Sequence, residues 1–286
     1  MEQWRRLSAA VGTSLIIPLN KQIKMRFIVL IMMAIPAIAW SQAYQLATPR
    51  IVADSIFFKQ SAKVQLELDL ENTAINYTLD GALPVENTPV YEKPVVVRQS
   101  TTVRGRAMHP DFLPSTFAEK QLFQIVSVPD SVRLNSAPDT TYSGGGQTSL
   151  FDLQKGARDT RDGRWLGFRM DTVVVLEVFF KTPVMNKRLM VSTLFDPNAW
   201  IFPPAAIEVL GAEAGKDLKP MGVWSAKTGP EWKDRPARYD LYQKVVLRPV
   251  AVDRMLIRII PFGPLPEGHS GAGQPAWLFL DEIFFQ

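Results

Sequence analysis

Short runs in which apolar and polar residues alternate dominate the chain after its first 43 residues. In residues 64–70 every second residue is apolar, as in a strand with one face in a core and one in solvent. Residues 75–79 run into Asp80-Gly81, a dipeptide that readily takes the positive φ angles of a tight turn. Residues 95–98 and 102–107 continue the series. The first part of the chain is therefore expected to be a small β-domain.

A second group of strand-like runs fills the C-terminal half, at residues 173–180, 206–210, 255–260 and 277–285. Prolines lie between or beside these runs, where a missing backbone N–H does no harm. Residues 126–149 are instead rich in Pro, Ser, Asp, Thr and Gly, which predicts a linker and a loop leading into the next domain. The pattern predicts an all-β chain of two β-sandwich domains, over residues 44–125 and 150–286.

Residues 25–43 read as a secretory signal peptide within a leader of residues 1–43. A charged start is followed by an apolar run of about a dozen residues and by small residues. That run is shorter than the roughly 20 apolar residues of a membrane-spanning helix. Cleavage is allowed after Ala39 or Ala43, a retained anchor is the alternative, and the true start is Met1 or Met25. We expect export to the periplasm, the cell surface or the medium, with no transmembrane span after cleavage.

The positive charge of the chain belongs to this leader. The sequence holds 32 Lys and Arg against 28 Asp and Glu, an excess of four. Residues 1–43 hold five basic residues and one acidic residue, the same excess, so the mature part is neutral. The basic pI therefore gives no indication of a nucleic-acid partner. The absence of cysteine excludes disulfides, thiolate metal sites and a lipidated-cysteine anchor.

Two motifs in the first domain carry a family resemblance. Residues 77–84 read Tyr-Thr-Leu-Asp-Gly-Ala-Leu-Pro, and residues 101–107 read Thr-Thr-Val-Arg-Gly-Arg-Ala, with Tyr91 between them. This pattern resembles the C-terminal, fibronectin-type-III-associated repeat of chitobiases and β-hexosaminidases over residues 45–125. The resemblance implies a small immunoglobulin/fibronectin-III-like sandwich that spaces or supports another module.

Three blocks in the second domain carry another resemblance, at residues 161–168, 200–204 and 271–283. In this order they look like the discoidin-like, galactose-binding-like region that ends many bacterial β-N-acetylhexosaminidases. The resemblance implies a discoidin-like jelly roll of the kind found in carbohydrate-binding modules.

The catalytic part of those enzymes is a separate barrel with an adjacent Asp-Glu pair. The mature chain has no room for such a barrel, and its Asp281-Glu282 pair lies in the last β-run. We expect a non-catalytic glycan-binding or glycan-associated accessory protein that could act beside a separate hexosaminidase. Its partner would be a glycan containing N-acetylhexosamine or galactose, or an envelope protein. Two alternatives stay open: a structural or protein-interaction module of the envelope, and an unrecognised glycoside hydrolase.

The resemblance also implies how a sugar would be held. Related modules stack loop aromatics on a pyranose ring and bind its hydroxyls with Arg, Asn or His. The residues expected to contact a ligand are Trp200, Phe202, Arg164, Trp232 and His269. Core or loop-bracing roles are the alternatives for each, and Trp165 and Trp277 are expected to be core residues.

A structural Ca²⁺ is the cofactor that the resemblance implies, held by backbone carbonyls, an early Asp and a late Glu. Asp152 and Glu282 stand at the resembling positions. Relatives usually read Asp-Gly where this chain reads Asp152-Leu153, so the turn there can differ. The alternative is a pair of carboxylates that form salt bridges or cap backbone amides.

Overall fold

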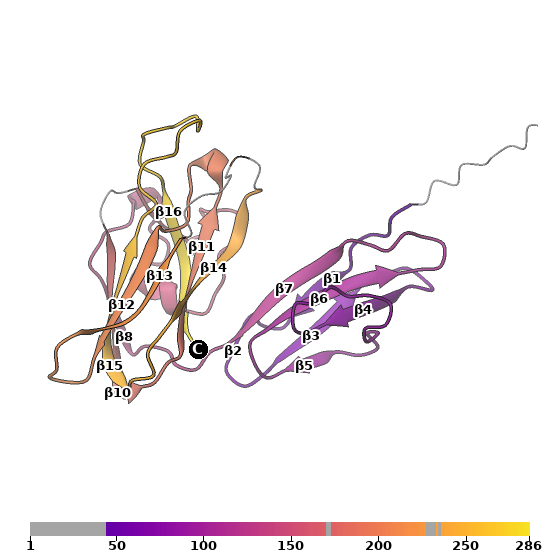
Figure 1. Cartoon of the computed structure of the whole chain (residues 1–286), viewed down its shortest axis with the longest axis horizontal. Coiled ribbons are helices and arrows are strands. Elements are labelled where there is room, and N and C mark those ends of the chain that lie inside the picture. Colours follow the sequence, from indigo (N-terminus) through magenta and orange to yellow (C-terminus); the bar gives the residue numbers. More distant parts are fainter. Residues whose placement is uncertain (1–43, 170–172, 227–232, 234–235) are drawn as a thin grey trace, which may run out of the picture. The chain divides into compact units, whose positions relative to one another are not determined.

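The computed structural model describes residues 44–169, 173–226, 233 and 236–286. The predicted leader and Trp232 lie outside these residues. The described part of the chain holds 16 strands and three short 3₁₀ helices (Figure 1). The predicted all-β class, with two β-sandwiches, is confirmed. No helix in this described part has the length and apolar content needed to cross a bilayer.

Seven strands build the first sandwich, as a three-stranded sheet β1-β3-β5 and a four-stranded sheet β2-β7-β6-β4 (Figure 1). Every second residue of β3 is buried, as its sequence pattern predicts. Val64 and Leu66 of β3 pack against Val103 and Leu122 of the opposite sheet in one apolar core. The strands are β1 (Arg50–Ala53), β2 (Phe57–Phe58), β3 (Ala62–Glu67), β4 (Ala74–Thr78), β5 (Val95–Val97), β6 (Thr101–Met108) and β7 (Phe117–Gln124).

Nine strands build the second sandwich, as a five-stranded sheet β13-β12-β15-β10-β8 and a four-stranded sheet β14-β11-β16-β9, hereafter the β16 sheet. Its core lies between the sheets, where Leu176 and Ile257 meet Val191 and Ile283. The strands are β8 (Ser131–Leu134), β9 (Leu166–Phe168), β10 (Val174–Val184), β11 (Arg188–Phe195), β12 (Ala206–Ala212), β13 (Lys219–Ser225), β14 (Arg238–Val246), β15 (Val252–Ile260) and β16 (Leu278–Phe285), and the 3₁₀ helices are η1 (Thr140–Tyr142), η2 (Gln147–Phe151) and η3 (Pro197–Ala199).

Residues 126–149 differ from the expected linker. β8 pairs with β10 and forms an edge of the five-stranded sheet. The helix η2 then buries Leu150 and Phe151 in the central core. β8 was missed because its alternation lasts only from Ser131 to Leu134, too short to stand out in a Pro- and Ser-rich segment. The second sandwich therefore starts at β8, before residue 150, where the predicted second domain begins.

A bulge in β16 determines where the acidic pair points. Ser192 of β11 faces Glu282, whereas the next residue, Thr193, faces Leu280, so Asp281 is the extra residue of the bulge. The core-facing residues of β16 change from even to odd numbers across it: Leu278, Leu280, Ile283 and Phe285. Asp281 and Glu282 lie between these pairs, where the alternation is interrupted.

Candidate functional site

Asp281 forms a buried ion pair with Lys155. Its side chain is fully buried, and Oδ2 accepts hydrogen bonds from Lys155 Nζ at 2.5 Å and from the Gly156 backbone N at 2.8 Å. Lys155 Nζ also donates to Ser192 Oγ at 2.9 Å and lies 4.6 Å from the centre of the Trp165 ring. A carboxylate, a hydroxyl and an aromatic face thus compensate the lysine charge in a place with little water.

Glu282 is also fully buried, but it forms no ion pair with the residues that the structure describes. Its Oε2 accepts from the Gln154 backbone N at 3.1 Å, while Oε1 has no hydrogen-bond partner in the described part of the chain. Burial, followed by the nearby carboxylates of Asp152 and Asp281, raises the pKa of Glu282 to about 9. Without a bound cation, Glu282 is therefore neutral at pH 7.

Asp152 meets Glu282 at the same backbone amide. Asp152 Oδ1 accepts from Gln154 N at 2.8 Å, so one N–H lies between the two carboxyl groups. Leu153, which lies between Asp152 and Gln154 in the sequence, has a φ of 60°, in the left-handed region that favours glycine. This conformation costs a non-glycine residue roughly 1–2 kcal/mol. The turn that differs in sequence from Asp-Gly thus still uses a backbone conformation suited to glycine.

Asp152 and Glu282 bring two carboxyl groups to one backbone amide, and these are the two residues that could hold a cation. Asp152, Asp281 and Glu282 share this region with the ammonium of Lys155, and among the described residues Glu282 Oε1 is buried without a partner. Carboxylate oxygens are the ligands that Ca²⁺ prefers. The described residues contain no group of three or more His, Cys, Asp or Glu able to hold a metal, so the other ligands would be backbone carbonyls or water.

A cavity of about 210 Å³ lies where β11 ends and β14 and β16 begin, at one end of the β16 sheet. Aromatic rings form much of its apolar wall, together with the aliphatic side chains of Leu194 and Ile201. Tyr142 packs edge-on against Trp277 and Phe279, with ring centroids 5.5 and 4.9 Å apart. Tyr239 joins the same cluster. Because Phe279 is buried while Trp277 and Tyr142 are half-buried, the last two present part of their rings to the cavity.

Charged groups complete the lining. The guanidinium of Arg158 is exposed and makes no hydrogen bond or ion pair with the described residues. Asp159 Oδ1 accepts from the Arg161 backbone N at 3.0 Å, and Asp196 Oδ1 accepts from the Asn198 backbone N at 3.1 Å. Each of these carboxylates keeps its second oxygen available. The cavity thus offers hydrogen-bond donors and acceptors beside an aromatic wall.

Three of the residues expected to contact a ligand gather in the loops that follow η3 and precede β16. Phe202, 2% exposed, packs against Phe195 and Phe262 and is a core residue, which corrects the expectation of a stacking ring. His269 is also buried, with Nε2 donating to Pro197 O at 2.7 Å and Nδ1 accepting from Gly271 N at 3.0 Å. Its two ring nitrogens therefore connect η3 to the loop before β16 and stabilise that loop.

Trp200 is half-buried and lies edge-on to His269, with ring centroids 6.2 Å apart. Its neighbours Ala199 and Ile201 line the cavity, but the Trp200 ring itself is not part of the lining. Its contact with a ligand stays a prediction.

The remaining aromatic and arginine candidates divide between core and surface. Arg164 Nη1 donates to the backbone O of Lys155 at 3.2 Å and so stabilises the backbone of the residue whose side chain pairs with Asp281. Trp165 is fully buried, as expected, and donates through Nε1 to Ala157 O at 2.8 Å. Trp277, expected in the core, is half-buried in the cavity wall. Sequence reasoning missed Tyr142, Arg158, Asp159, Asp196 and Tyr239, which no local motif connects.

Comparisons with known proteins bear most directly on the family resemblance of the first domain. Residues 64–121 match the family described as Fn3 associated, so the predicted fibronectin-III-associated domain is confirmed there. No curated protein matches the chain. It is similar to the C-terminal domain of a chitobiase from Bacteroides fragilis, at 13% identity over 56% of this chain and 95% of that chain (TM-score 0.33). It is also similar to a SusE-like protein, at 10% identity over 82% and 95% of the two chains (TM-score 0.35). A third similar structure is GH31 CBM32-2 bound to GalNAc, at 13% identity over 54% and 96% (TM-score 0.34).

Proposed function

We propose that this chain is a non-catalytic glycan-binding protein whose second domain holds a sugar in the cavity at the end of the β16 sheet. The proposal rests on one observation: the cavity combines aromatic rings with positively and negatively charged hydrogen-bonding side chains. A pyranose has an apolar face and a rim of hydroxyls that donate and accept, so such a lining matches it. Glycans containing N-acetylhexosamine or galactose are the proposed class, in keeping with the sequence resemblance.

The size of the cavity suits one sugar ring. At about 210 Å³ it is smaller than pockets for drug-sized ligands, which run from roughly 300 to 1,000 Å³. The proposed contact is therefore with the end of a glycan chain or a single side branch.

The positions of the carboxylates support a binding role over hydrolysis. Asp159 and Asp196 each use one oxygen to cap backbone amides of their own loop, the usual role of a loop aspartate. Asp281 and Glu282 are fully buried and bonded to residues 154–156, and neither lines the cavity. The Asp-Glu pair is therefore not placed as the acid–base pair of a glycosidase would be.

Arg158→Ala is expected to weaken sugar binding at least about tenfold, because it removes a charged donor from the cavity. Since Arg158 is exposed and unpaired among the described residues, the fold should persist. Isothermal titration of residues 44–286 with N-acetylglucosamine, N-acetylgalactosamine and galactose oligosaccharides measures the effect. Arg161→Ala is the matched control, since Arg161 is exposed in the same loop but outside the lining. Equal binding by the Arg158 and Arg161 variants would contradict the site.

We further propose that Asp152 and Glu282 hold a structural Ca²⁺. The cation would supply the positive charge that the buried oxygen of Glu282 lacks and would tie the end of η2 to β16. Its role would be stabilisation of the fold rather than contact with the sugar.

Export is proposed from the leader alone. The chain would reach the periplasm, cell surface or medium after cleavage following Ala43 or Ala39. N-terminal sequencing of the mature protein is expected to give Tyr44 or Trp40 as the first residue, and a chain that still begins at Met1 or Met25 would contradict export by this signal.

A further inference from the structure

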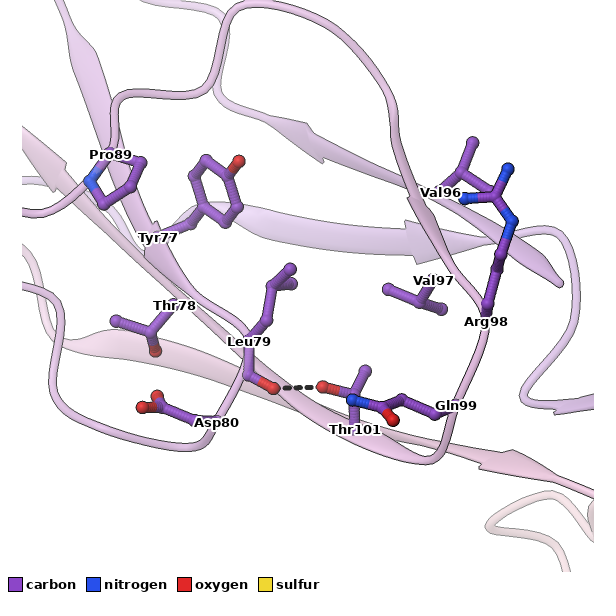
Figure 2. Close-up of a pocket in the computed structure, with 10 residues that line it drawn as sticks. All are labelled: Tyr77, Thr78, Leu79, Asp80, Pro89, Val96, Val97, Arg98, Gln99 and Thr101. Carbon is purple, nitrogen blue, oxygen red and sulfur yellow. Dashed lines mark hydrogen bonds between the residues drawn. The ribbon is translucent and has the colours of Figure 1, made fainter.

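A larger groove lies in the first domain, between the end of β4 and the segment from β5 to β6. It encloses about 670 Å³, within the range of roughly 300–1,000 Å³ that ligand pockets occupy. β4 and β5 are edge strands of the two different sheets, so the groove opens where the sandwich is not closed by a further strand. Figure 2 shows Tyr77 and Leu79 on one side of this space and Val97 and Arg98 on the other.

The walls of the groove are apolar and partly uncovered. Val97 is 5% exposed and belongs to the core beneath the groove. Leu79 and Val96 are 38% and 47% exposed, although both are apolar. Pro89 lies beside the ring of Tyr77 (Figure 2). A ligand with an apolar face would cover surface that now lies in water.

Hydrogen-bonding groups without partners line the same space. The Tyr77 hydroxyl, the Arg98 guanidinium and the Gln99 amide make no hydrogen bond or ion pair with the described residues. Asp80 uses Oδ1 to accept from Ala82 N at 2.9 Å, which leaves Oδ2 available. By contrast, Thr101 is used within the wall, where its hydroxyl donates to Leu79 O (Figure 2). The wall is thus held in place by its own bonds while four polar groups stay available to a ligand.

An added β-strand is a poor occupant of this groove. The outer edge of β4 is already covered, because Tyr77 N donates to Pro89 O at 2.9 Å and Tyr91 N donates to Ile75 O at 2.8 Å. The other edge, β5, is only three residues long. The available groups are side chains of mixed character, one cation, one anion, an amide and a phenol. Neutral hydroxyls, which both donate and accept, can satisfy all of them, whereas a ligand of one charge is repelled by Asp80 or by Arg98.

We infer that the first domain carries a glycan site of its own, in which the groove around Tyr77, Leu79, Arg98 and Gln99 binds a neutral oligosaccharide. The Tyr77 ring with Leu79 and Val96 covers the apolar faces of the sugar rings, and Arg98, Gln99 and Asp80 bind hydroxyls. Its volume is about three times that of the cavity in the second domain, so it accepts a longer segment of a chain. This site does not depend on sugar binding by the second domain.

The test uses ¹H–¹⁵N NMR of residues 44–286 with tetrasaccharides of N-acetylglucosamine and of β-galactose as probes. Site-resolved signals separate this groove from the cavity near Arg158, so each site can fail alone. At least one tetrasaccharide is expected to shift signals of residues 77–80 and 96–101. The double variant Arg98→Ala with Gln99→Ala is expected to weaken that binding at least about tenfold.

The matched control is Lys59→Ala with Gln60→Ala, which removes an adjacent exposed cation and amide from the same domain outside the groove. Binding by the control should equal that of the unaltered chain. An extended octapeptide of alternating Val and Thr serves as a further probe, for a peptide ligand. The inference is overturned if neither tetrasaccharide shifts these signals or if the octapeptide alone shifts them. It is also overturned if the Arg98 and Gln99 variant binds a tetrasaccharide as well as the control does.

Discussion

Replacing Asp281 with Asn is expected to destabilise the protein by about 3–5 kcal/mol, because it leaves the mostly buried ammonium of Lys155 without a counter-charge. The carboxylate is fully buried and also accepts from Gly156 N, so the substitution disturbs both of its partners. For a chain of this size the loss corresponds to a fall in melting temperature of roughly 6–20 °C. Urea unfolding and calorimetry at pH 7 measure both quantities.

The control for this prediction is the exposed ion pair between Arg50 and Glu67. Its atoms lie 2.6 Å apart, but the two side chains are 75% and 43% exposed. Glu67→Gln should therefore change stability by no more than about 1 kcal/mol. If Asp281→Asn lowers stability as little as Glu67→Gln does, the ion pair of Asp281 with Lys155 is not what holds residues 155–156 to β16.

Glu282 is expected to make the metal-free protein less stable as the pH rises. The folded chain keeps a proton on Glu282 up to a pH of about 9, whereas the unfolded chain releases it near 4.5. Since the unfolded state then binds fewer protons, the free energy of unfolding falls between about pH 5 and pH 9, by at most about 1.4 kcal/mol per pH unit. Glu282→Gln removes this titration, so its unfolding free energy in EDTA should vary less with pH and exceed that of the unaltered chain at pH 8.

Bound calcium should restore the stability lost at high pH if Asp152 and Glu282 are ligands of the ion. At about 100 times its dissociation constant, a bound ion stabilises the folded chain by roughly 2.7 kcal/mol. The gain should appear at pH 8 in the unaltered chain and be absent in Glu282→Gln. A pH dependence that survives in Glu282→Gln would show that another group titrates. A calcium effect absent from the unaltered chain would count against the cation site.

Strands with one buried face could be predicted from the alternation of their residues, whereas β11, which is covered on both faces, was missed. β3 and β10 alternate clearly between buried and less buried residues, so their patterns were visible. β11 is buried at seven of its eight positions, and such a strand has no polar residues at every second place to reveal it. β16 was found as a run, but the bulge at Asp281 depends on pairing with β11, which no local pattern records.

The candidate site was predicted less well, because its residues come from distant loops. Phe202 lies in a Pro-rich stretch that reads as exposed, yet contacts with Phe195 and Phe262 bury it. The cavity residues Tyr142, Arg158 and Tyr239 are spread over the chain and are brought together only by the fold. Asp152 and Glu282, by contrast, were paired through the family resemblance, and the structure does place their carboxyl groups around one backbone amide.

The most direct test of glycan binding by the second domain is a crystal structure of residues 44–286 with the oligosaccharide that binds best in titration. A terminal sugar ring is expected against Trp277 and Tyr142, with its hydroxyls bonded to Arg158 and to the available oxygen of Asp159 or Asp196. A crystal in which the sugar is bound elsewhere on the second domain, or in which the cavity stays empty at saturating sugar, would contradict this expectation.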